Sequence, residues 1–398
     1  MQPYEGIDVL DLTQSIAGPI STQFLGTLGA NVVKVEPPGG DAFRGLLDGA
    51  MFASVNLGGK RSVSLDLKTE EGQAAAQSLA ERADVVVESF RPGVVERFGL
   101  DYESVAEVNE DVVYLSLTGF GQDGPRTDWP AYDPVVQAMS GLMSTIGYQD
   151  RPPVRIGASV IDYGTGTTAA FLLASALMER ERSGEGTHID VSLFEVAVSW
   201  MGYWIAHYTG TGEVPERSGQ GFAGLAPNEV FHAAGDEPFY LSVVNDRLYE
   251  RLCRGLDRED LLTDERFAEN ADRWEHREAL RAELDAEFRR HDREDLTALL
   301  AEAGVPTGPL QTVDEVAEDP QVQARELLTD SYNLWNDVDV QTAGAPYQAS
   351  GERPELGERP PARGEHTREV LEELGYSEED VARLVKEDVA HPSEHDPR

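Results

Sequence analysis

The sequence has few of the residues that form disulfides, metal sites or basic surfaces. Cys253 is the only cysteine among 398 residues, which excludes an internal disulfide and a cysteine metal cluster. The eight histidines show no metal-ligand spacing, so we expect no metal. Lysine occurs only at positions 34, 60, 68 and 386, and 73 acidic residues outnumber 33 basic ones. The formal net charge of −40 argues against nucleic acid or an anionic membrane as a partner.

Two further absences bear on localisation. The N-terminal MQPYEGIDVLDLT lacks the basic segment and apolar core of a signal peptide. No apolar run in the sequence approaches the length needed to span a bilayer. The acidic residues are spread along the chain, and arginine prevails over lysine, a composition that keeps proteins soluble in concentrated salt. We therefore expect a soluble, cytoplasmic protein of a halophile.

Apolar strands alternate with helices in the first third of the chain. Strands are predicted over residues 7–12, 31–36, 61–67, 84–88 and 112–118, and helices over 14–29 and 69–82. This order predicts an α/β fold with a mostly parallel sheet and helices on both faces. We expect residues 1–205 to form most of a large domain and 225–325 a smaller one. Residues 326–398 follow, with an extended strap over 350–363 and two helices over 367–387.

Asp162 stands at the start of a long apolar segment. Small residues follow it at positions 164–168, and the run 169–178 predicts a fully buried helix that ends near Gly184. Backbone N–H groups and the helix dipole are expected to keep Asp162 ionised. A plain helix cap is the simpler interpretation. Small neighbours would also leave room for a substrate to approach, as a carboxylate nucleophile requires.

Basic residues gather where the predicted strands end, at the edge where such sheets bind ligands. Lys60, Arg61, Lys68, Arg91 and Arg97 would serve either phosphates or ordinary surface ion pairs. Residues 119–124, GFGQDG, fit a dinucleotide fingerprint, but the segment 125–130 that follows, PRTDWP, cannot readily open the required helix. No GxSxG motif is present, which argues against a serine hydrolase.

Several stretches together resemble the class III CoA-transferases of the formyl-CoA and carnitine type. They are GIDVLDLTQSIAGP with GANVVKVEPPGGD, ADVVVESFRPGVVERFGLDYE, GFGQDGPRTDWPAYDPVVQAMSGLMSTIG, and the Asp162 segment through GEGTHIDVSLFE. The resemblance implies a Rossmann-like large domain built from both chain ends, a smaller α+β domain, and an interlocked homodimer. It implies a CoA thioester as substrate, without a permanently bound cofactor.

The same resemblance assigns residues to the reaction. Asp162 would be the nucleophile, forming a mixed anhydride and then an aspartyl-CoA thioester, with backbone N–H groups near Gly164–Gly166 stabilising the oxyanions. The residues that match the family's CoA site are Ser15, Ile16, Leu65, Lys68, Ser89, Phe90, Arg91, Arg97, Tyr132 and Asp133.

The sequence also departs from the family pattern. Pro37 replaces a basic residue, and Ile16 replaces a glutamine, which argues against formyl or oxalate specificity. The segment Gly219–Gly224 is only a loose counterpart of the glycine lid of the oxalate enzymes.

A sister branch, the α-methylacyl-CoA racemases, uses a histidine where this chain has Tyr132, a poor base at neutral pH. We therefore predict a transferase, with the racemase as the alternative. Succinyl-CoA is the expected donor, and a small dicarboxylate such as mesaconate the acceptor, whose second carboxylate Arg44 or Arg155 would bind.

Overall fold

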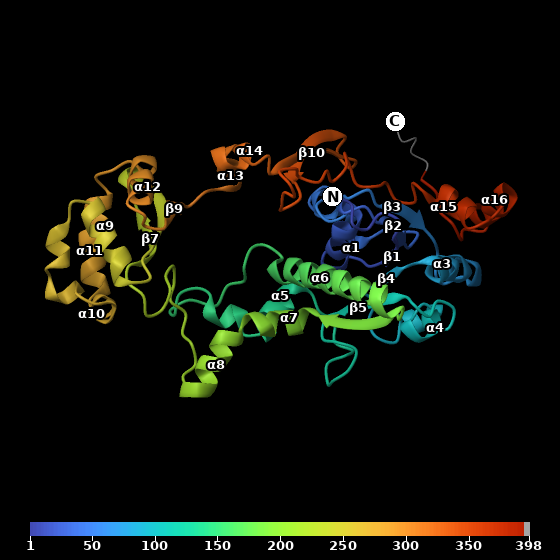
Figure 1. Cartoon of the computed structure of the whole chain (residues 1–398), viewed down its shortest axis with the longest axis horizontal. Coiled ribbons are helices and arrows are strands. Elements are labelled where there is room, and N and C mark those ends of the chain that lie inside the picture. Colours follow the sequence, from blue (N-terminus) through green and yellow to red (C-terminus); the bar gives the residue numbers. More distant parts are fainter. Residues whose placement is uncertain (394–398) are drawn as a thin grey trace. The chain divides into compact units, whose positions relative to one another are not determined.

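The chain divides into two compact units. The computed structural model describes residues 1–393. The larger unit combines Met1–Ser140, Ile156–Tyr203 and the chain from Pro320 onward, so it is built from both ends of the sequence. The smaller unit comprises Gly141–Arg155 and Trp204–Asp319. Figure 1 shows both units, coloured along the sequence.

A six-stranded parallel sheet forms the centre of the larger unit and confirms the predicted α/β class. Its order is β3-β2-β1-β4-β5-β6, the doubly wound order in which β1 lies between β2 and β4. The strands are β1 (Asp8–Leu12), β2 (Asn31–Glu36), β3 (Arg61–Ser64), β4 (Val85–Glu88), β5 (Val113–Thr118) and β6 (Thr187–Ser192). Their runs of buried valine and leucine suit a sheet covered on both faces.

Helices cover the two faces of this sheet. On one face, α1 (Ala17–Thr27) packs against α6 (Val160–Ser183). On the other face, the core joins buried residues of α3 (Glu70–Arg82) to those of α15 (Thr367–Glu373) and α16 (Glu378–Lys386). The last two helices confirm the predicted C-terminal pair and show how the chain end returns to the larger unit (Figure 1).

The long helix α6 differs from two expectations. It is not fully buried within the chain, because Phe171 and Met178 are 68% and 54% exposed. By length and composition alone it would be able to cross a membrane, so the expectation that no such segment exists was wrong. Its contacts with α1 and β5 are those of a helix packed on the sheet of its own unit.

Shorter helices and turns connect the strands and long helices of the larger unit. They are η1 (Ala42–Gly45), α2 (Ala50–Ala53), η2 (Val95–Phe98), α4 (Tyr102–Ala106), α5 (Asp133–Met139), α7 (Leu193–Trp200), α8 (Gly202–Thr211, shared with the smaller unit) and α14 (Pro320–Ala324). A hairpin of β10 (Leu328–Asn333) and β11 (Val338–Ala343) was not predicted. Trp335 of this hairpin packs on Phe52, with ring centroids 6.2 Å apart.

The smaller unit has its own core. Its antiparallel sheet consists of β7 (Asn228–His232), β8 (Pro238–Ser242) and β9 (Thr307–Pro309). Its main helices are α9 (Asp246–Gly255), α10 (Asn270–Glu275), α11 (Arg277–Phe288), α12 (Arg293–Glu302) and α13 (Val313–Glu318), with short turns η3 (Leu142–Thr145), η4 (Ala234–Asp236), η5 (Glu259–Leu262) and η6 (Glu265–Phe267). Phe231, Phe239 and Phe288 pack together, and Cys253 lies buried in the same core.

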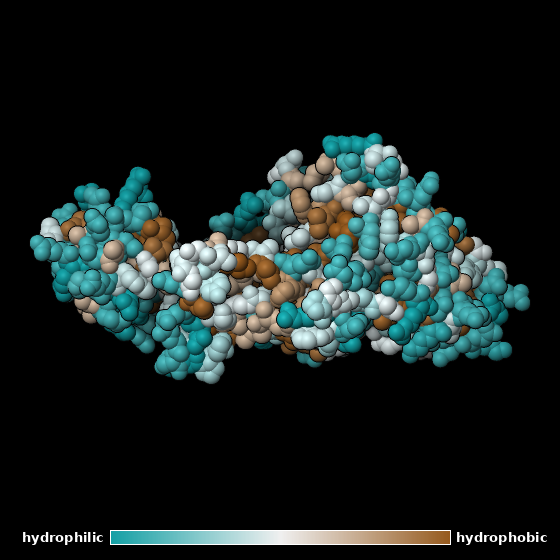
Figure 2. All heavy atoms as spheres, turned by 90° about the horizontal axis from the view of Figure 1, so that it is seen from below, coloured by the Kyte–Doolittle hydropathy of each residue, from teal (hydrophilic) through white to brown (hydrophobic). Residues whose placement is uncertain are grey.

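The surface reflects the acidic composition. Figure 2 shows one face of the molecule, seen from below relative to Figure 1. Most of its side chains are hydrophilic, and hydrophobic ones gather in patches. In the larger unit the exposed apolar side chains include Phe171, Met178, Trp200 and Tyr203 of α6, α7 and α8.

Candidate active site

A cavity of about 420 Å³ lies at the carboxyl ends of β1, β4 and β5. The carboxyl edge of a doubly wound sheet is where ligands bind. All lining residues belong to the larger unit: Leu12, Gln14, Ser15, Ala17, Gly18, Ser89, Phe90, Arg91, Pro92, Val94, Leu117, Thr118, Gly119, Thr127, Trp129, Pro130, Ala131, Tyr132, Asp162 and Leu193. The predicted nucleophile and several predicted CoA contacts therefore share one cavity.

Asp162 is the third residue of α6 and does not cap this helix. The N-cap residue Ser159 makes no side-chain cap hydrogen bond, and Asp133 takes over this role, since its Oδ2 accepts the N–H groups of Ile161 at 2.7 Å and Asp162 at 3.2 Å. The other oxygen of Asp133 accepts from the Gln137 side chain at 2.5 Å. Because Asp133 satisfies these donors, the interpretation of Asp162 as a plain cap is wrong.

The carboxyl group of Asp162 is poorly solvated. The residue is 8% exposed, and no donor among the described residues contacts its carboxylate oxygens in a hydrogen bond. Burial, together with the negative charge of Asp133, raises the pKa of Asp162 to about 7. The expectation that the helix holds Asp162 firmly ionised was therefore wrong. A carboxylate formed here is weakly stabilised, which favours its reaction with an electrophile.

The small residues after Asp162 serve helix packing. A Cβ on Gly164 would overlap the indole of Trp200, and a Cβ on Gly166 would lie 2.5 Å from the carbonyl oxygen of Ala17. The two glycines therefore let α7 and α1 approach α6. The expectation that these small residues open a path for substrate was wrong. The N–H groups of Gly164–Gly166 belong to the interior of α6, where helical hydrogen bonds occupy them. Free N–H groups in the cavity wall come from the first turn of α1, at Ala17 and Gly18.

Five of the ten predicted CoA contacts line the cavity: Ser15, Ser89, Phe90, Arg91 and Tyr132. The loops after β1 and β4 are joined by a hydrogen bond, since the Ser89 hydroxyl accepts the N–H of Gln14 at 3.0 Å. Glu88 accepts the N–H of Phe90 at 2.7 Å, and burial raises the pKa of Glu88 to about 7. These two hydrogen bonds hold the turn after β4 in place.

The other five predicted contacts lie outside the cavity lining. Ile16 packs on Ile20 and Val55, Leu65 belongs to the main core, and Asp133 is buried under Asp162. Lys68 and Arg97 are exposed, and the Nε of Arg97 donates to the Gly93 carbonyl at 3.1 Å. Sequence matching therefore found the segments of the site, but not which side chains face it.

Three basic residues considered as anion ligands have other partners. Lys60 is buried and contacts Asp11 at 3.1 Å, and Arg61 pairs with Glu369 and Glu373. Arg44 is paired with Glu36, so it does not face the cavity as a ligand for a second carboxylate. Arg155 is exposed and belongs to the smaller unit. Among the described lining residues Arg91 is the single cation.

Residues missed from the sequence come from two segments. Gln14 lies two residues after the end of β1, a position that predicts a ligand contact, and Thr127 and Trp129 lie in the proline-containing segment after β5. That segment belongs to a stretch that resembles the family, but the resemblance assigns Tyr132 and Asp133 to the CoA site, not Thr127 or Trp129. Within residues 1–393 the structure shows no group of three or more His, Cys, Asp or Glu side chains that would hold a metal ion.

Comparisons with known proteins agree with this geometry. The sequence profile described as CoA-transferase family III matches residues 4–367. An acetyl-CoA:oxalate CoA-transferase of Acetobacter aceti is 39% identical over 366 residues, covering 90% of this chain and 94% of that protein. A succinyl-CoA:mesaconate CoA-transferase of Haloarcula hispanica is 38% identical over 391 residues, covering 94% and 97%. The crystal structure of a CAIB/BAIF family protein from Brucella suis matches with a TM-score of 0.83 and 36% identity, covering 94% of this chain and 99% of that one.

Proposed function

We propose, because the chain belongs to CoA-transferase family III, that it moves CoA from an acyl-CoA donor to a free small carboxylic acid through covalent intermediates on Asp162. The observation that carries this proposal is the state of Asp162. It lines the cavity, Asp133 accepts the free N–H groups at the start of its helix, and burial raises the pKa of Asp162 to about 7. A carboxyl group with no structural partner in a cavity suits a nucleophile.

The reaction divides into four acyl transfers at one carboxylate. The ionised Asp162 attacks the thioester carbonyl of the donor, releasing CoA thiolate and forming a mixed anhydride. The thiolate attacks the aspartyl carbonyl, releasing the donor acid and leaving an aspartyl-CoA thioester. The acceptor carboxylate then attacks this thioester and again releases CoA thiolate. Attack of the thiolate on the acceptor carbonyl gives the new CoA ester and restores Asp162.

The cavity wall supplies the groups that this sequence of steps needs. The unpaired N–H groups at the start of α1 stabilise oxyanions that develop beside Asp162. Arg91 binds a phosphate of CoA, and Phe90 packs against its apolar arm. Lys68 and Arg97, exposed outside the cavity, bind the outer phosphate end.

A dicarboxylate is the proposed acceptor and succinyl-CoA the proposed donor. The relatives named above are described as acting on oxalate and mesaconate, both dicarboxylates. Mesaconate fits better than oxalate because Ile16, where a glutamine would assist a small acyl group, packs against Ile20 and Val55. These relatives are named as transferases, and Tyr132 in place of histidine leaves the racemase alternative without its base.

The active form is proposed to be an interlocked homodimer in a salt-rich cytoplasm. Phe171, Met178, Trp200 and Tyr203 are large apolar side chains left exposed on one chain, as at a subunit interface. The net charge of −40 supports a high-salt environment, where self-repulsion is screened. Sedimentation in concentrated salt tests the dimer, since a monomeric mass would contradict it.

The direct test is transfer itself. Purified protein is mixed in concentrated salt with succinyl-CoA and each candidate acid, and the CoA esters are separated by chromatography. We expect mesaconyl-CoA from the wild-type protein and none from Asp162→Ala. Exchange of the α-proton of a branched acyl-CoA with deuterated solvent, without CoA transfer, would instead support the racemase.

A further inference from the structure

A network of buried charges lies beneath the loop that connects β1 to α1. We call it the buried charge network; its members are Asp11, Lys34, Glu36, Asp41, Arg44 and Lys60, none more than 7% exposed. Its three acidic and three basic side chains balance in charge. Burying charges is unfavourable unless each is paired and hydrogen-bonded. The proposed chemistry uses none of these groups, so their place beside the cavity needs a separate explanation.

One part of the network holds the loop of residues 13–15 by its backbone. Lys34 Nζ donates to the carbonyl oxygen of Thr13 at 2.5 Å and lies 3.4 Å from Asp41 Oδ2. The other oxygen of Asp41 accepts the N–H of Ser15 at 3.4 Å. Asp11 accepts from both the backbone N–H of Thr13, at 2.9 Å, and its hydroxyl, at 2.6 Å. The loop is thus tied to buried charges at both ends.

The loop needs this support because its backbone is unusual. Ser15 has a φ of 72°, in the left-handed region that residues with a Cβ rarely adopt. Such a conformation persists only where surrounding contacts enforce it. The N–H of Ser15 points to Asp41, and the following residues start α1. The network therefore holds the residues that lead into α1.

The start of α1 forms the cavity wall that faces the nucleophile helix. Gln14, Ser15, Ala17 and Gly18 line the cavity together with Asp162. The close packing of α1 on α6 leaves no space for a Cβ between Gly166 and the Ala17 carbonyl. A shift of the loop would therefore change the distance between Asp162 and the N–H groups of α1. Errors of about 1 Å in such arrangements can reduce rates about 100-fold.

We propose that Lys34 and Asp41 are positioning residues, which hold the loop at residues 13–15 so that the first turn of α1 faces Asp162 in the geometry that acyl transfer requires. This inference rests on the proposed function. It adds that part of the rate of transfer depends on two buried charges that touch no substrate.

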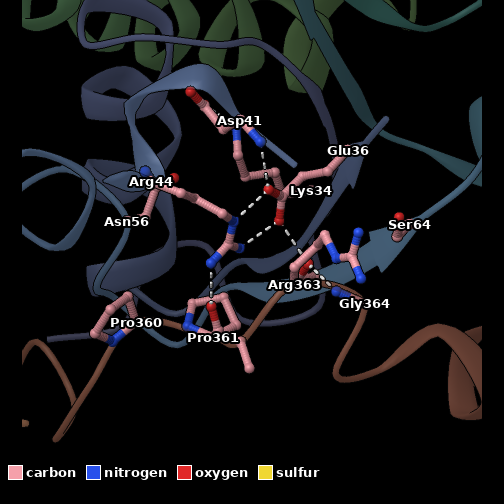
Figure 3. Close-up of polar contacts among 12 residues, drawn as sticks. Lys34, Glu36, Asp41, Arg44, Asn56, Ser64, Pro360, Pro361, Arg363 and Gly364 are labelled. Carbon is pink, nitrogen blue, oxygen red and sulfur yellow. Dashed lines mark hydrogen bonds and ion pairs between the residues drawn. The ribbon is translucent and has the colours of Figure 1, made fainter. Parts of the chain in front are cut away.

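The other part of the network provides a matched control. Arg44 donates to Glu36 through Nε at 2.6 Å and to the carbonyl oxygen of Pro361 at 3.0 Å, as Figure 3 shows. Its guanidinium also lies 3.8 Å from the centre of the Phe52 ring. These contacts join the C-terminal strap to β2, and none of them reaches residues 13–18. Arg44 is thus a buried, paired cation of the same network that reaches the loop only indirectly, through Glu36, whose Oε2 also accepts the N–H of Asp41 at 3.0 Å.

The test compares Lys34→Met with Arg44→Met in the full-length protein. Each change removes one buried cation, and we expect both variants to melt at a lower temperature than the wild type. At a temperature below both transitions, kcat for succinyl-CoA transfer should fall about 100-fold in Lys34→Met and less than about threefold in Arg44→Met. KM for succinyl-CoA should change little in either variant. Equal losses of kcat in the two variants, or no loss in Lys34→Met, would overturn the proposal.

A second pair covers the case in which Lys34→Met does not fold. Asp41→Asn keeps an oxygen that can accept the N–H groups of Ser15 and of Phe43, which Asp41 caps at the start of η1, whereas Asp41→Ala removes both contacts. We expect Asp41→Asn to retain more kcat than Asp41→Ala; equal activity would count against the proposal. Failure of the proposed function itself gives a different result, because the wild-type protein would then show no transfer.

Discussion

Replacing Asp162 with asparagine should stabilise the protein while it abolishes activity. The residue is buried beside Asp133, and this environment raises its pKa from 3.8 to about 7. In the unfolded chain the same carboxyl loses its proton near pH 4. Between these values the folded state binds more protons than the unfolded state, so wild-type stability falls as the pH rises from about 4 to about 7. Asparagine carries no charge and is free of this loss.

The magnitude follows from the two pKa values. Above pH 7, holding the ionised Asp162 in its site costs the folded state at most about 4 kcal/mol relative to a neutral side chain. Relaxation of the site and water in the open cavity reduce this cost, so we expect a gain of about 1–3 kcal/mol in Asp162→Asn at pH 8. For a chain of this length that raises Tm by a few degrees, at roughly 1 °C per kcal/mol.

Differential scanning calorimetry between pH 5 and pH 8.5 would measure the effect. Removing any negative charge from a chain of net charge −40 relieves repulsion, so the control is Asp150→Asn, at an exposed position. The Tm gain of Asp162→Asn should grow with pH and level off above about pH 7, whereas that of Asp150→Asn should stay nearly constant. A gain that does not depend on pH, or a lower Tm at pH 8, would refute the account of Asp162.

Three further predictions concern the site and the smaller unit. First, kcat/KM for the CoA donor should rise with pH around a midpoint near 7, because only ionised Asp162 attacks. Asp133→Asn should move this midpoint to lower pH, and an unmoved midpoint in the pH–rate profile would exclude Asp133 as a cause of the raised pKa of Asp162. Second, Arg91→Gln should raise KM for succinyl-CoA at least about tenfold and leave KM for the acceptor acid nearly unchanged, since charged hydrogen bonds to phosphate contribute more than neutral ones. Steady-state kinetics with each substrate varied in turn would measure both constants, and an equal rise in both would contradict the prediction. Third, Cys253 should resist iodoacetamide in the folded protein, because it is fully buried and burial raises the pKa of its thiol to about 11. Rapid alkylation at pH 8 without denaturant, measured by mass spectrometry, would contradict the packing of the smaller unit.

The sheet was predictable because its signals are local. Uninterrupted valine-rich runs such as Val85–Glu88 are typical of buried parallel strands, and each lies within a residue or a few of its predicted position. The hairpin β10–β11 was missed because β10 is mostly polar, both strands stay largely accessible, and the hairpin is supported by Trp335, which packs on Phe52 far away in the sequence. Such long-range contacts leave no periodic pattern.

The site was predictable only to the level of segments. Asp162 was correctly placed at the start of a helix, but its raised pKa comes from burial and from Asp133, which lies 29 positions earlier and reaches the same helix end only in the folded chain. Arg44 and Lys60 looked like anion ligands because the sequence does not reveal that Glu36 and Asp11 are buried with them. Facing direction and charge pairing are properties of the packed structure.

The most direct test of the central claim is to trap the acylated nucleophile. The protein is mixed with succinyl-CoA in concentrated salt, quenched with hydroxylamine and digested, and the peptides are examined by mass spectrometry. The account predicts a hydroxamate on the peptide that contains Asp162, and its loss in Asp162→Ala. An unmodified Asp162 in samples that transfer CoA, or a hydroxamate on a different carboxylate, would contradict it.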